Sequence, residues 1–169
     1  VKWNRITEHV ISDDGTLVAF RTEPWTGDPT VTLYDGNALM KASFSCATGI
    51  NITPDSRFLI FTIKTPEDKV KELKLKKTKK DDMPPDMLGI YNIREGATDT
   101  VARLKSYKVP SKWTGWIAWQ TEPVKEKSTA TKDTTCDGKE NDKKPTTESA
   151  ENGYTLFIRN LSSGQTATV

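Results

Sequence analysis

Three similar segments recur along the chain and constrain its fold more than any other feature. They are D-G-T-L-V-A-F at 14–20, D-S-R-F-L-I-F at 55–61 and T-G-W-I-A-W at 114–119. Each begins with small or polar turn residues and continues as a short apolar run, which is typical of a strand covered on both faces. A second strand-like segment follows each of them, at 31–35, 88–92 and 154–161. We therefore interpret the repeating unit as a β-hairpin that occurs three times.

The spacing of the repeats predicts the architecture. Phe20 and Phe61 end the first two runs and lie 41 residues apart in sequence, which is the length expected of a four-stranded propeller blade. The third run ends later, at Trp119, because an insertion at 64–86 separates the strands of the second hairpin, and a larger one at 121–153 separates those of the third. We predict an all-β fold, a partial β-propeller of about three blades in a single domain spanning 1–169, with both insertions on one rim.

The first insertion has helical signals of its own. In T-P-E-D at 65–68, Thr65 is the expected N-cap and Pro66 the first helical residue. We predict one short helix over about 66–79, ended by the D-D-M-P-P run at 81–85. Eight lysines and six acidic residues lie between 64 and 86, so we interpret the lysine run as a solvated helix rather than a docking patch for phosphate or nucleic acid.

The second insertion, 121–153, is polar almost throughout. Val124 is its one large aliphatic residue, and such a segment buries too little apolar surface to offset the entropy of ordering its backbone. We therefore expect a mobile loop there.

Charge and cysteine content exclude several protein classes. With 25 Lys plus Arg against 23 Asp plus Glu, the chain lacks the basic excess of a nucleic-acid-binding protein. It contains no apolar run near the ~20 residues that a membrane-spanning helix needs. Two cysteines are too few for a disulfide framework or a four-ligand zinc site. We expect two unrelated thiols, with a Cys46–Cys136 bridge as the alternative.

The sequence offers no complete catalytic site. His9 is the single histidine, the residue type best suited to acid–base chemistry at neutral pH. It has no matching nucleophile motif, and no dinucleotide or phosphate-binding glycine loop occurs. We interpret His9 as structural or surface-exposed, and we assign no catalytic residue, cofactor or metal.

Two groups of aspartates could be read as ligands or as turn residues. Asp81, Asp82 and Asp86 suggest calcium, but the segment lacks the alternation and glycine of an EF-hand loop. Asp14 and Asp55 occupy matched positions in the repeats. We interpret Asp82 or Asp86 as a turn residue, and Asp14 and Asp55 as turn residues that accept hydrogen bonds from nearby backbone amides.

Five tryptophans raise the question of a stacking site. Trp116 and Trp119 point to opposite faces of a strand, so with Trp113 they form one platform only if the backbone bulges at Gly115. We expect these three to pack between blades. Trp25, in the turn P-W-T-G-D-P, is the candidate for an exposed contact with a substrate or partner.

An ordered series of segments covers nearly the whole chain and resembles a known family. The series comprises S-D-D-G-T-L-V-A-F with V-T-L-Y-D, T-P-D-S-R-F-L-I-F-T-I-K with K-K-D-D-M-P-P-D-M-L-G-I-Y, and S-Y-K-V-P-S-K-W-T-G-W-I-A-W-Q with N-G-Y-T-L-F-I-R-N-L-S-S-G. Together they resemble the N-terminal β-propeller region of the prolyl oligopeptidase and dipeptidyl-peptidase family of serine peptidases, most closely its large members from Bacteroidetes.

That resemblance implies a propeller seated over a C-terminal α/β-hydrolase domain that carries a Ser, Asp and His triad. The propeller would filter or position peptide substrates for the hydrolase domain, and the protein would be periplasmic or secreted. None of the triad maps onto these residues, which implies a segment without the catalytic domain. The paired glutamates that hold a free amine in the dipeptidyl-peptidase branch also have no convincing counterpart.

Two further hypotheses remain beside this noncatalytic role. The chain could belong to a stand-alone propeller that docks a protein partner, or could itself be a hydrolase, which the missing triad argues against. An open arc of blades leaves strand edges and apolar faces uncovered. We therefore expect the isolated chain to self-associate.

Overall fold

The computed structural model describes residues 3–78, 83–122 and 154–169 and consists almost entirely of antiparallel strands. The described elements are β1 (Asn4–Ile11), β2 (Leu17–Pro24), β3 (Thr30–Asp35), β4 (Met40–Ser45), β5 (Ala47–Ile52), β6 (Phe58–Ile63), α1 (Glu67–Leu75), β7 (Met87–Asn92), β8 (Ala97–Val101), β9 (Leu104–Lys108), β10 (Trp116–Thr121), β11 (Thr155–Asn160) and β12 (Thr166–Thr168).

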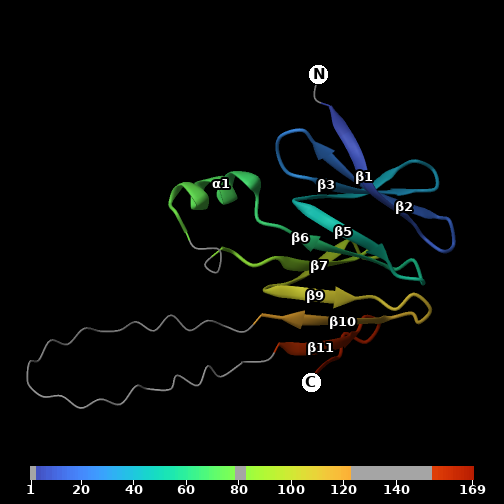
Figure 1. Ribbon diagram of the computed structural model, residues 1–169. Coiled ribbons are helices and arrows are strands. Elements are labelled where there is room, and N and C mark those ends of the chain that lie inside the picture. Colours follow the sequence, from blue (N-terminus) through green and yellow to red (C-terminus); the bar gives the residue numbers. More distant parts are fainter. Residues whose placement is uncertain (1–2, 79–82, 123–153) are drawn as a thin grey trace, which may run out of the picture.

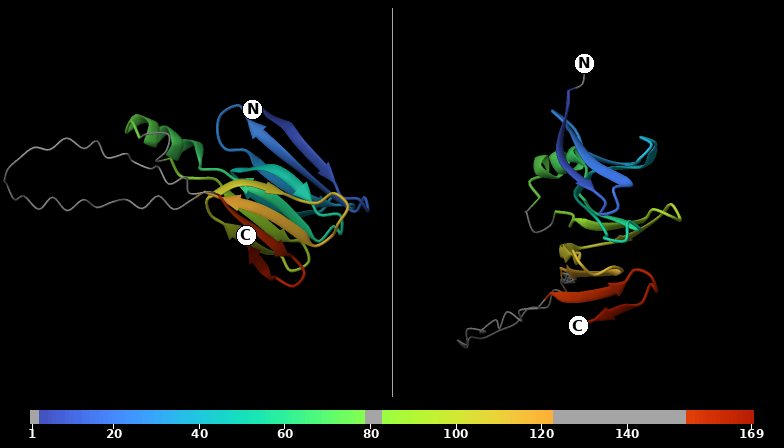
Figure 2. Two further views of the ribbon diagram at one scale, coloured as in Figure 1. Left: turned by 60° about the horizontal axis from the view of Figure 1, so that its bottom comes forward. Right: turned by 90° about the vertical axis from the view of Figure 1, so that its right-hand side faces the viewer.

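The strands form three four-stranded sheets that follow one another along the chain (Figures 1 and 2). Within each sheet, strands adjacent in sequence pair in antiparallel fashion. Blade 1 is β1–β4, blade 2 is β5–β8 and blade 3 is β9–β12. The predicted all-β arrangement of about three blades with one short helix is therefore confirmed.

The three repeated hairpins are the middle strand pairs of the blades. They are β2–β3, β6–β7 and β10–β11, each paired in unbroken register. The flanking strands were not predicted from the sequence. Strands such as β1 and β8 are exposed along most of their length, so they lack the continuous apolar run that marks a strand buried on both faces.

The hydrophobic core lies between the blades in two clusters. The first joins blades 1 and 2 and contains Leu17, Ala19, Val31, Leu33, Ala47, Ile50, Leu59, Phe61 and Tyr91. The second joins blades 2 and 3 and contains Phe58, Ile60, Leu88, Ile90, Leu104, Ile117 and Trp119. Because β6 alternates between the two, blade 2 is covered on both faces.

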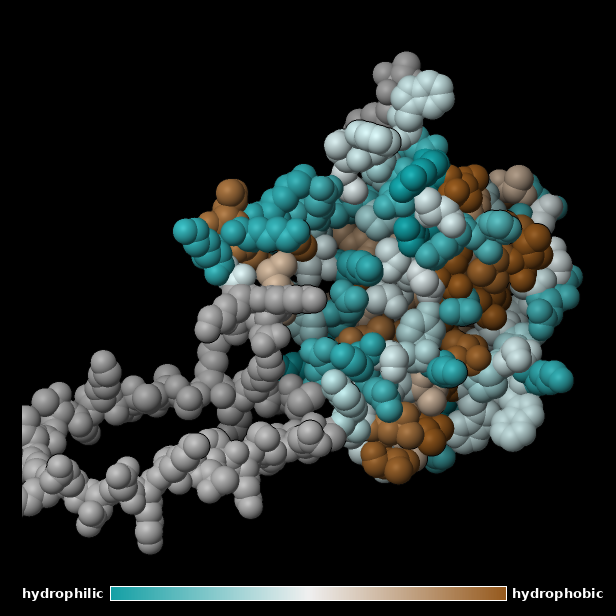
Figure 3. Space-filling view, in the orientation of Figure 1, coloured by the Kyte–Doolittle hydropathy of each residue, from teal (hydrophilic) through white to brown (hydrophobic). Residues whose placement is uncertain are grey.

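Among residues 3–78, 83–122 and 154–169, blades 1 and 3 each leave one face without a neighbouring sheet. On blade 1, register places Ile11, Val18, Tyr34 and Met40 in one row across the sheet. Figure 3 shows hydrophobic side chains exposed over blade 1 and over the C-terminal strands.

A glycine on β7 allows the tightest contact in the first cluster. Gly89 pairs with Phe61, and a β-carbon built on Gly89 would lie 2.5 Å from the Phe61 ring. Since Phe61 is fully buried, its ring cannot turn aside without disturbing the core.

The helix differs from the predicted one at both ends. Pro66, not Thr65, is the N-cap, with extended backbone (φ −51°, ψ 141°) and without a side-chain cap bond. At the other end Lys77 adopts φ +53° and Thr78 donates its amide to the Leu73 carbonyl at 3.0 Å, a Schellman ending. The helix therefore stops at Leu75. The predicted continuation of the helix over 76–78 is wrong, and residue 79 lies outside the described residues. No signal in the sequence marks this ending, because Lys77 and not glycine takes the left-handed conformation.

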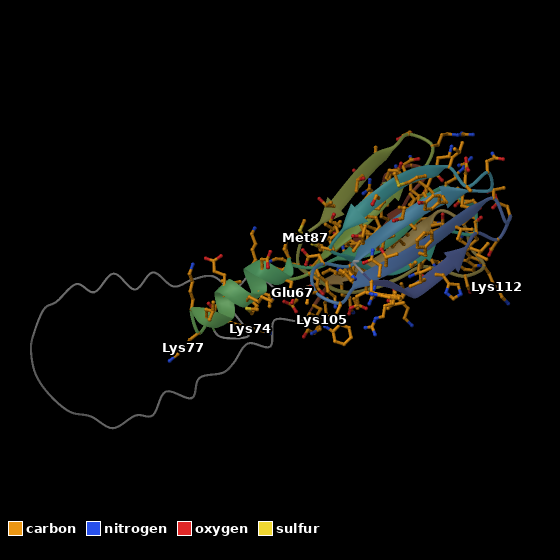
Figure 4. The ribbon with its side chains drawn as sticks, turned by 90° about the horizontal axis from the view of Figure 1, so that it is seen from above. Glu67, Lys74, Lys77, Met87, Lys105 and Lys112 are labelled. Carbon is orange, nitrogen blue, oxygen red and sulfur yellow. The ribbon has the colours of Figure 1, made fainter. Side chains whose placement is uncertain are left out.

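The loops divide into two rims. The insertion rim contains the β2–β3 loop, α1, the end of β10 and the start of β11 (Figure 1). The turn rim contains the short turns β1–β2, β3–β4, β5–β6, β7–β8, β9–β10 and β11–β12. Figure 4 shows α1 projecting from the sheets, with Glu67 at its base, Lys74 and Lys77 farther out, and Lys112 at the opposite end of the molecule. Residues 123–153, where a mobile loop was predicted, lie outside the described residues.

Candidate functional site

The candidate site is a hollow of about 300 Å³ at the insertion rim, between the start of β1 and the end of β2. It is lined by Trp3, Asn4, Arg5, Glu23, Pro24 and Trp25. The two indoles are the most exposed large hydrophobic groups of this region, Trp3 at 81% and Trp25 at 93%. Trp25 was predicted as an exposed aromatic, and the structure adds Trp3 beside it.

The β1–β2 pairing positions the polar side of the hollow. Arg5 pairs with Glu23 across the two strands, and the guanidinium lies 3.3 Å from the carboxylate. Pro24 ends β2 and starts the turn that carries Trp25 away from the sheet. The exposed indoles are thus held beside a charge pair on a paired, two-stranded base.

A network of polar contacts runs from this hollow along blade 1. Arg21 donates to Glu23 at 3.2 Å and to Glu8 at 2.6 Å. A bulge in β1 between Ile6 and Glu8 brings the Glu8 side chain onto the face that carries Arg5. Because Arg21 is largely buried, with 17% of its side chain exposed, these two carboxylates supply the charge partners that its burial requires.

The network continues through the first strands of the other two blades. The second carboxylate oxygen of Glu8 accepts the Gly49 amide of β5 at 2.9 Å. The Tyr107 hydroxyl of β9 donates to the Gly49 carbonyl and accepts from the Asn51 amide at 3.0 Å. One glycine, at φ +62°, thus connects Glu8 of blade 1 with Tyr107 of blade 3.

These contacts shift the pKa values of two groups. The hydrogen bond from Arg21 is the main cause that lowers the pKa of Glu23, and the charges of Arg21 and Arg5 act in the same direction. Burial is the main cause that raises the pKa of Tyr107; the Glu8 charge adds to this and the Asn51 hydrogen bond opposes it. At neutral pH the network therefore holds Glu23 ionised and Tyr107 neutral.

The arrangement suits binding rather than bond cleavage. Two exposed indoles offer apolar faces with a polar N–H edge, and the Arg5–Glu23 pair offers a donor and an acceptor beside them. Such a surface can contact apolar groups through the indoles and polar groups through the Arg5–Glu23 pair.

The other residues singled out in the sequence are not at this hollow. His9 lies exposed on β1, opposite Phe20. Asp86 precedes β7, and its carbonyl accepts the Leu104 amide. Asp81 and Asp82 lie outside the described residues. Within the described ranges, no group of three His, Cys, Asp or Glu residues is placed to hold a metal ion.

Cys46 is the single residue between β4 and β5, at φ +58°. Burial, together with the nearby charge of Asp28, raises the pKa of its thiol, so the group is a weak nucleophile. Its alternative partner Cys136 lies outside the described residues.

The three tryptophans of the third repeat separate, as expected for Trp116 and Trp119. Trp119 is buried and stacks on Phe157 of its own blade with a centroid distance of 5.6 Å. It also belongs to the cluster that joins blades 2 and 3, so its predicted packing between blades is confirmed. Trp116 and Trp113 line a hollow on the uncovered face of blade 3 instead, where no second sheet packs on them within the described part of the chain.

The matched aspartates are turn acceptors, as predicted. Asp14 accepts the Thr16 amide at 3.0 Å, and Asp55 accepts the Arg57 amide at 3.3 Å. In each turn the aspartate also accepts the buried hydroxyl two residues earlier, Ser12 or Thr53. The segment S-x-D or T-x-D thus closes the β1–β2 and β5–β6 turns.

A second turn device was not recognised from the sequence. Asp35, Asn92 and Asn160 each end the third strand of a blade, and each side chain accepts two backbone amides of the following turn. The recurrence of Asp or Asn at the end of V-T-L-Y-D, L-G-I-Y-N and L-F-I-R-N is the signal that would have identified it.

The described residues contain no helix with the length and apolar character required to cross a membrane.

No protein-family model matches the chain, and no curated protein is similar enough in sequence to match it. Solved structures are similar in fold. The β-propeller domain of the trilobed protease from Pyrococcus furiosus matches with a TM-score of 0.60 and 11% identity, over 99% of this chain and 43% of that one. The acylaminoacyl peptidase from Pyrococcus horikoshii matches with a TM-score of 0.50 and 9% identity, over 99% and 25%. A eukaryotic initiation factor matches with a TM-score of 0.51 and 8% identity, over 98% and 33%.

The chain thus spans less than half the length of each of these structures. At such low identity the similarity concerns the fold, which is that of a β-propeller domain.

Proposed function

We propose that the chain is a noncatalytic propeller segment of a serine peptidase and that its insertion rim contacts peptide substrates. In this proposal the segment filters or positions peptides for a hydrolase domain encoded elsewhere in the gene, in a periplasmic or secreted protein. The observation that carries the proposal is the hollow in which Trp3 and Trp25 stand exposed beside the Arg5–Glu23 pair.

Fold similarity supports the same proposal. One similar structure is by name the β-propeller domain of a protease and another is a peptidase, and the ordered sequence segments resemble a family of serine peptidases.

A stand-alone propeller that docks a folded protein is the second candidate, because the eukaryotic initiation factor is similar in fold to about the same degree as the acylaminoacyl peptidase. The gene region after residue 169 discriminates the two. A G-x-S-x-G segment followed by Asp and His supports the peptidase, whereas further blades and a stop codon support the docking module.

Peptide contact is tested by fluorescence anisotropy with a labelled, proline-containing peptide and the 169-residue chain. We expect saturable binding, and an increase of about tenfold in Kd for Trp25→Ala, the usual scale for a well-placed tryptophan. Trp113→Ala is the matched control, since Trp113 is also exposed, at 74%, but lies on the turn rim. Absent binding, or equal losses in both variants, would contradict the proposed contact.

A further inference from the structure

A second cavity, of about 380 Å³, lies on the turn rim between blades 2 and 3. Its walls come from the β5–β6, β7–β8 and β11–β12 turns and from β8 and β11. The hollow described above contains none of these residues, so the two are separate places on the molecule.

Three arginines line this cavity, one from each of three structural units: Arg57 from the β5–β6 turn, Arg94 from the β7–β8 turn and Arg159 from β11. Arg57 and Arg94 are exposed, and neither forms a salt bridge within residues 3–78, 83–122 and 154–169. Their guanidinium groups are therefore available to a ligand.

Arg159 is the deepest of the three, with 24% of its side chain exposed. One terminal nitrogen bonds Asp99 of blade 2 at 2.9 Å, which joins the two blades. Its Nε is buried and has no hydrogen-bond partner in the described structure. Arg159 thus adds a fixed positive charge to the lining, while Arg57 and Arg94 are the guanidinium groups exposed to a ligand.

The turns that present the arginines are fixed by their own hydrogen bonds. The Asn92 side chain accepts the amides of Arg94 and Glu95, and the Asn160 side chain accepts those of Ser162 and Ser163. The cavity walls are consequently preorganised, which reduces the entropy lost when a ligand binds.

The lining selects for charge and for shape. Glu95 and Asp99 stand among the three arginines, so the site carries one net positive charge and suits a monoanion better than a dianion. Phe58, Ile90 and Leu161 supply an apolar part of the lining. A ligand that matches both features has one carboxylate and a compact apolar group.

We propose that this cavity, the arginine cavity, binds a carboxylate carried on a small aliphatic group, such as the C-terminal residue of a peptide or a free branched acid. The carboxylate contacts Arg57 and Arg94, and the aliphatic group lies against Phe58 and Leu161. The proposal is independent of peptide binding at the insertion rim, because the two sites share no residue.

The test is a titration of the 169-residue chain, followed by NMR, with N-acetyl-leucine, its C-terminal amide and 4-methylpentanoate. We expect saturable binding of N-acetyl-leucine and at least about tenfold weaker binding of the amide, as loss of a charge-assisted hydrogen bond predicts. Tighter binding of N-acetyl-leucine than of 4-methylpentanoate identifies a peptide C-terminus as the preferred source, and equal binding identifies a free acid; both support the carboxylate site.

Variants locate the binding. Arg57→Gln and Arg94→Gln lie in exposed turns and should each weaken N-acetyl-leucine binding while leaving the melting temperature nearly unchanged. Lys112→Gln removes a cation from the same rim outside the cavity (Figure 4) and should have no effect on binding. The proposal is overturned if N-acetyl-leucine does not bind, if the amide binds equally well, or if both arginine variants bind like the unmodified chain.

Discussion

The carboxylate of Asp28, in the β2–β3 loop of blade 1, accepts a hydrogen bond of 2.7 Å from the backbone amide of Glu67, the first residue of α1. In return the Glu67 carboxylate accepts the Gly27 amide at 2.9 Å. A loop of blade 1 therefore caps a helix inserted in blade 2. None of the α1 side chains is buried, and this reciprocal pair attaches the start of the helix to blade 1.

Removing the Asp28 carboxylate should loosen α1. We expect Asp28→Ala to destabilise the helix by about 1 kcal/mol, the usual scale for a lost N-cap. Hydrogen exchange of the α1 amides should accelerate by roughly fivefold, while the core strands β6 and β7 keep their protection.

Thr65→Ala is the matched control for Asp28→Ala. Thr65 is the cap that the T-P-E-D signature predicts, but the helix has no side-chain cap bond of its own. Hydrogen exchange of the α1 amides in Thr65→Ala should match that in the unmodified chain. If the α1 amides exchange faster in Thr65→Ala and at the unchanged rate in Asp28→Ala, the local cap and not Asp28 holds the start of the helix.

How much of the fold was predictable depended on where each residue's partner lies. The run ending at Phe61 identifies a central strand, because burial on both faces leaves a continuous apolar sequence. The run ending at Trp119 identifies a second one, although one face of its blade is uncovered among the described residues. The capping by Asp28 comes from a residue 39 positions away, and such a partner leaves no local signal. Trp25 was recognisable because its own turn residues mark it. Arg21 and Tyr107 were not, because their partners lie on other strands and, for Tyr107, in another blade.

Tyr107 connects blade 3 to blade 2 through its hydroxyl group. We expect Tyr107→Phe to lower the free energy of unfolding by about 1 kcal/mol, because the Gly49 carbonyl and the Asn51 amide lose a partner. The measurement is urea unfolding at neutral pH. Lys105→Met, on the same strand but exposed, serves as the control and should change little.

The same substitution should alter the alkaline stability. The pKa of Tyr107 is raised above its ordinary value of 10.0, so above pH 10 the unfolded chain releases this proton before the folded chain does. The stability that Tyr107 contributes is thus present below that pH and is lost as the pH rises further. Unfolding curves from pH 9 to about 11 should fall more steeply for the unmodified chain than for Tyr107→Phe; parallel curves would contradict this role.

Asp14 should govern part of the acid stability. The Ser12 hydroxyl, followed by the amide and hydroxyl of Thr16, holds the pKa of Asp14 far below its ordinary value of 3.8. The stabilisation is present above that value and is lost as the pH falls through the folded pKa, because the unfolded chain takes up the proton first. Asp14→Asn should therefore be less stable at neutral pH and should lose less stability between about pH 4 and pH 2. Asp13→Asn, a neighbouring exposed aspartate, should keep the normal acid profile.

Gly89→Ala should overpack the core between blades 1 and 2. The added methyl group would lie 2.5 Å from the ring of Phe61, and we expect a loss of about 1–3 kcal/mol in the free energy of unfolding. Gly36→Ala is the control, since its nearest neighbour would be 3.6 Å away. The double variant Gly89→Ala with Phe61→Leu should recover part of the loss, and additive losses would show that the clash is not with Phe61.

The uncovered faces of blades 1 and 3 lead to the last prediction, which concerns the isolated 169-residue chain. Ile11 and Met40 are each 61% exposed on the outer face of blade 1, and Trp116 is 43% exposed on that of blade 3. Burial of such faces against a second copy would remove apolar surface from water at about 25 cal/mol per Å². We expect the mass measured by light scattering after size exclusion to rise with concentration. Ile11→Lys and Trp116→Lys should each suppress this rise, whereas Leu75→Lys, which changes an even more exposed apolar residue on α1, should not. A compact monomer at the highest concentrations would show that these faces do not drive association.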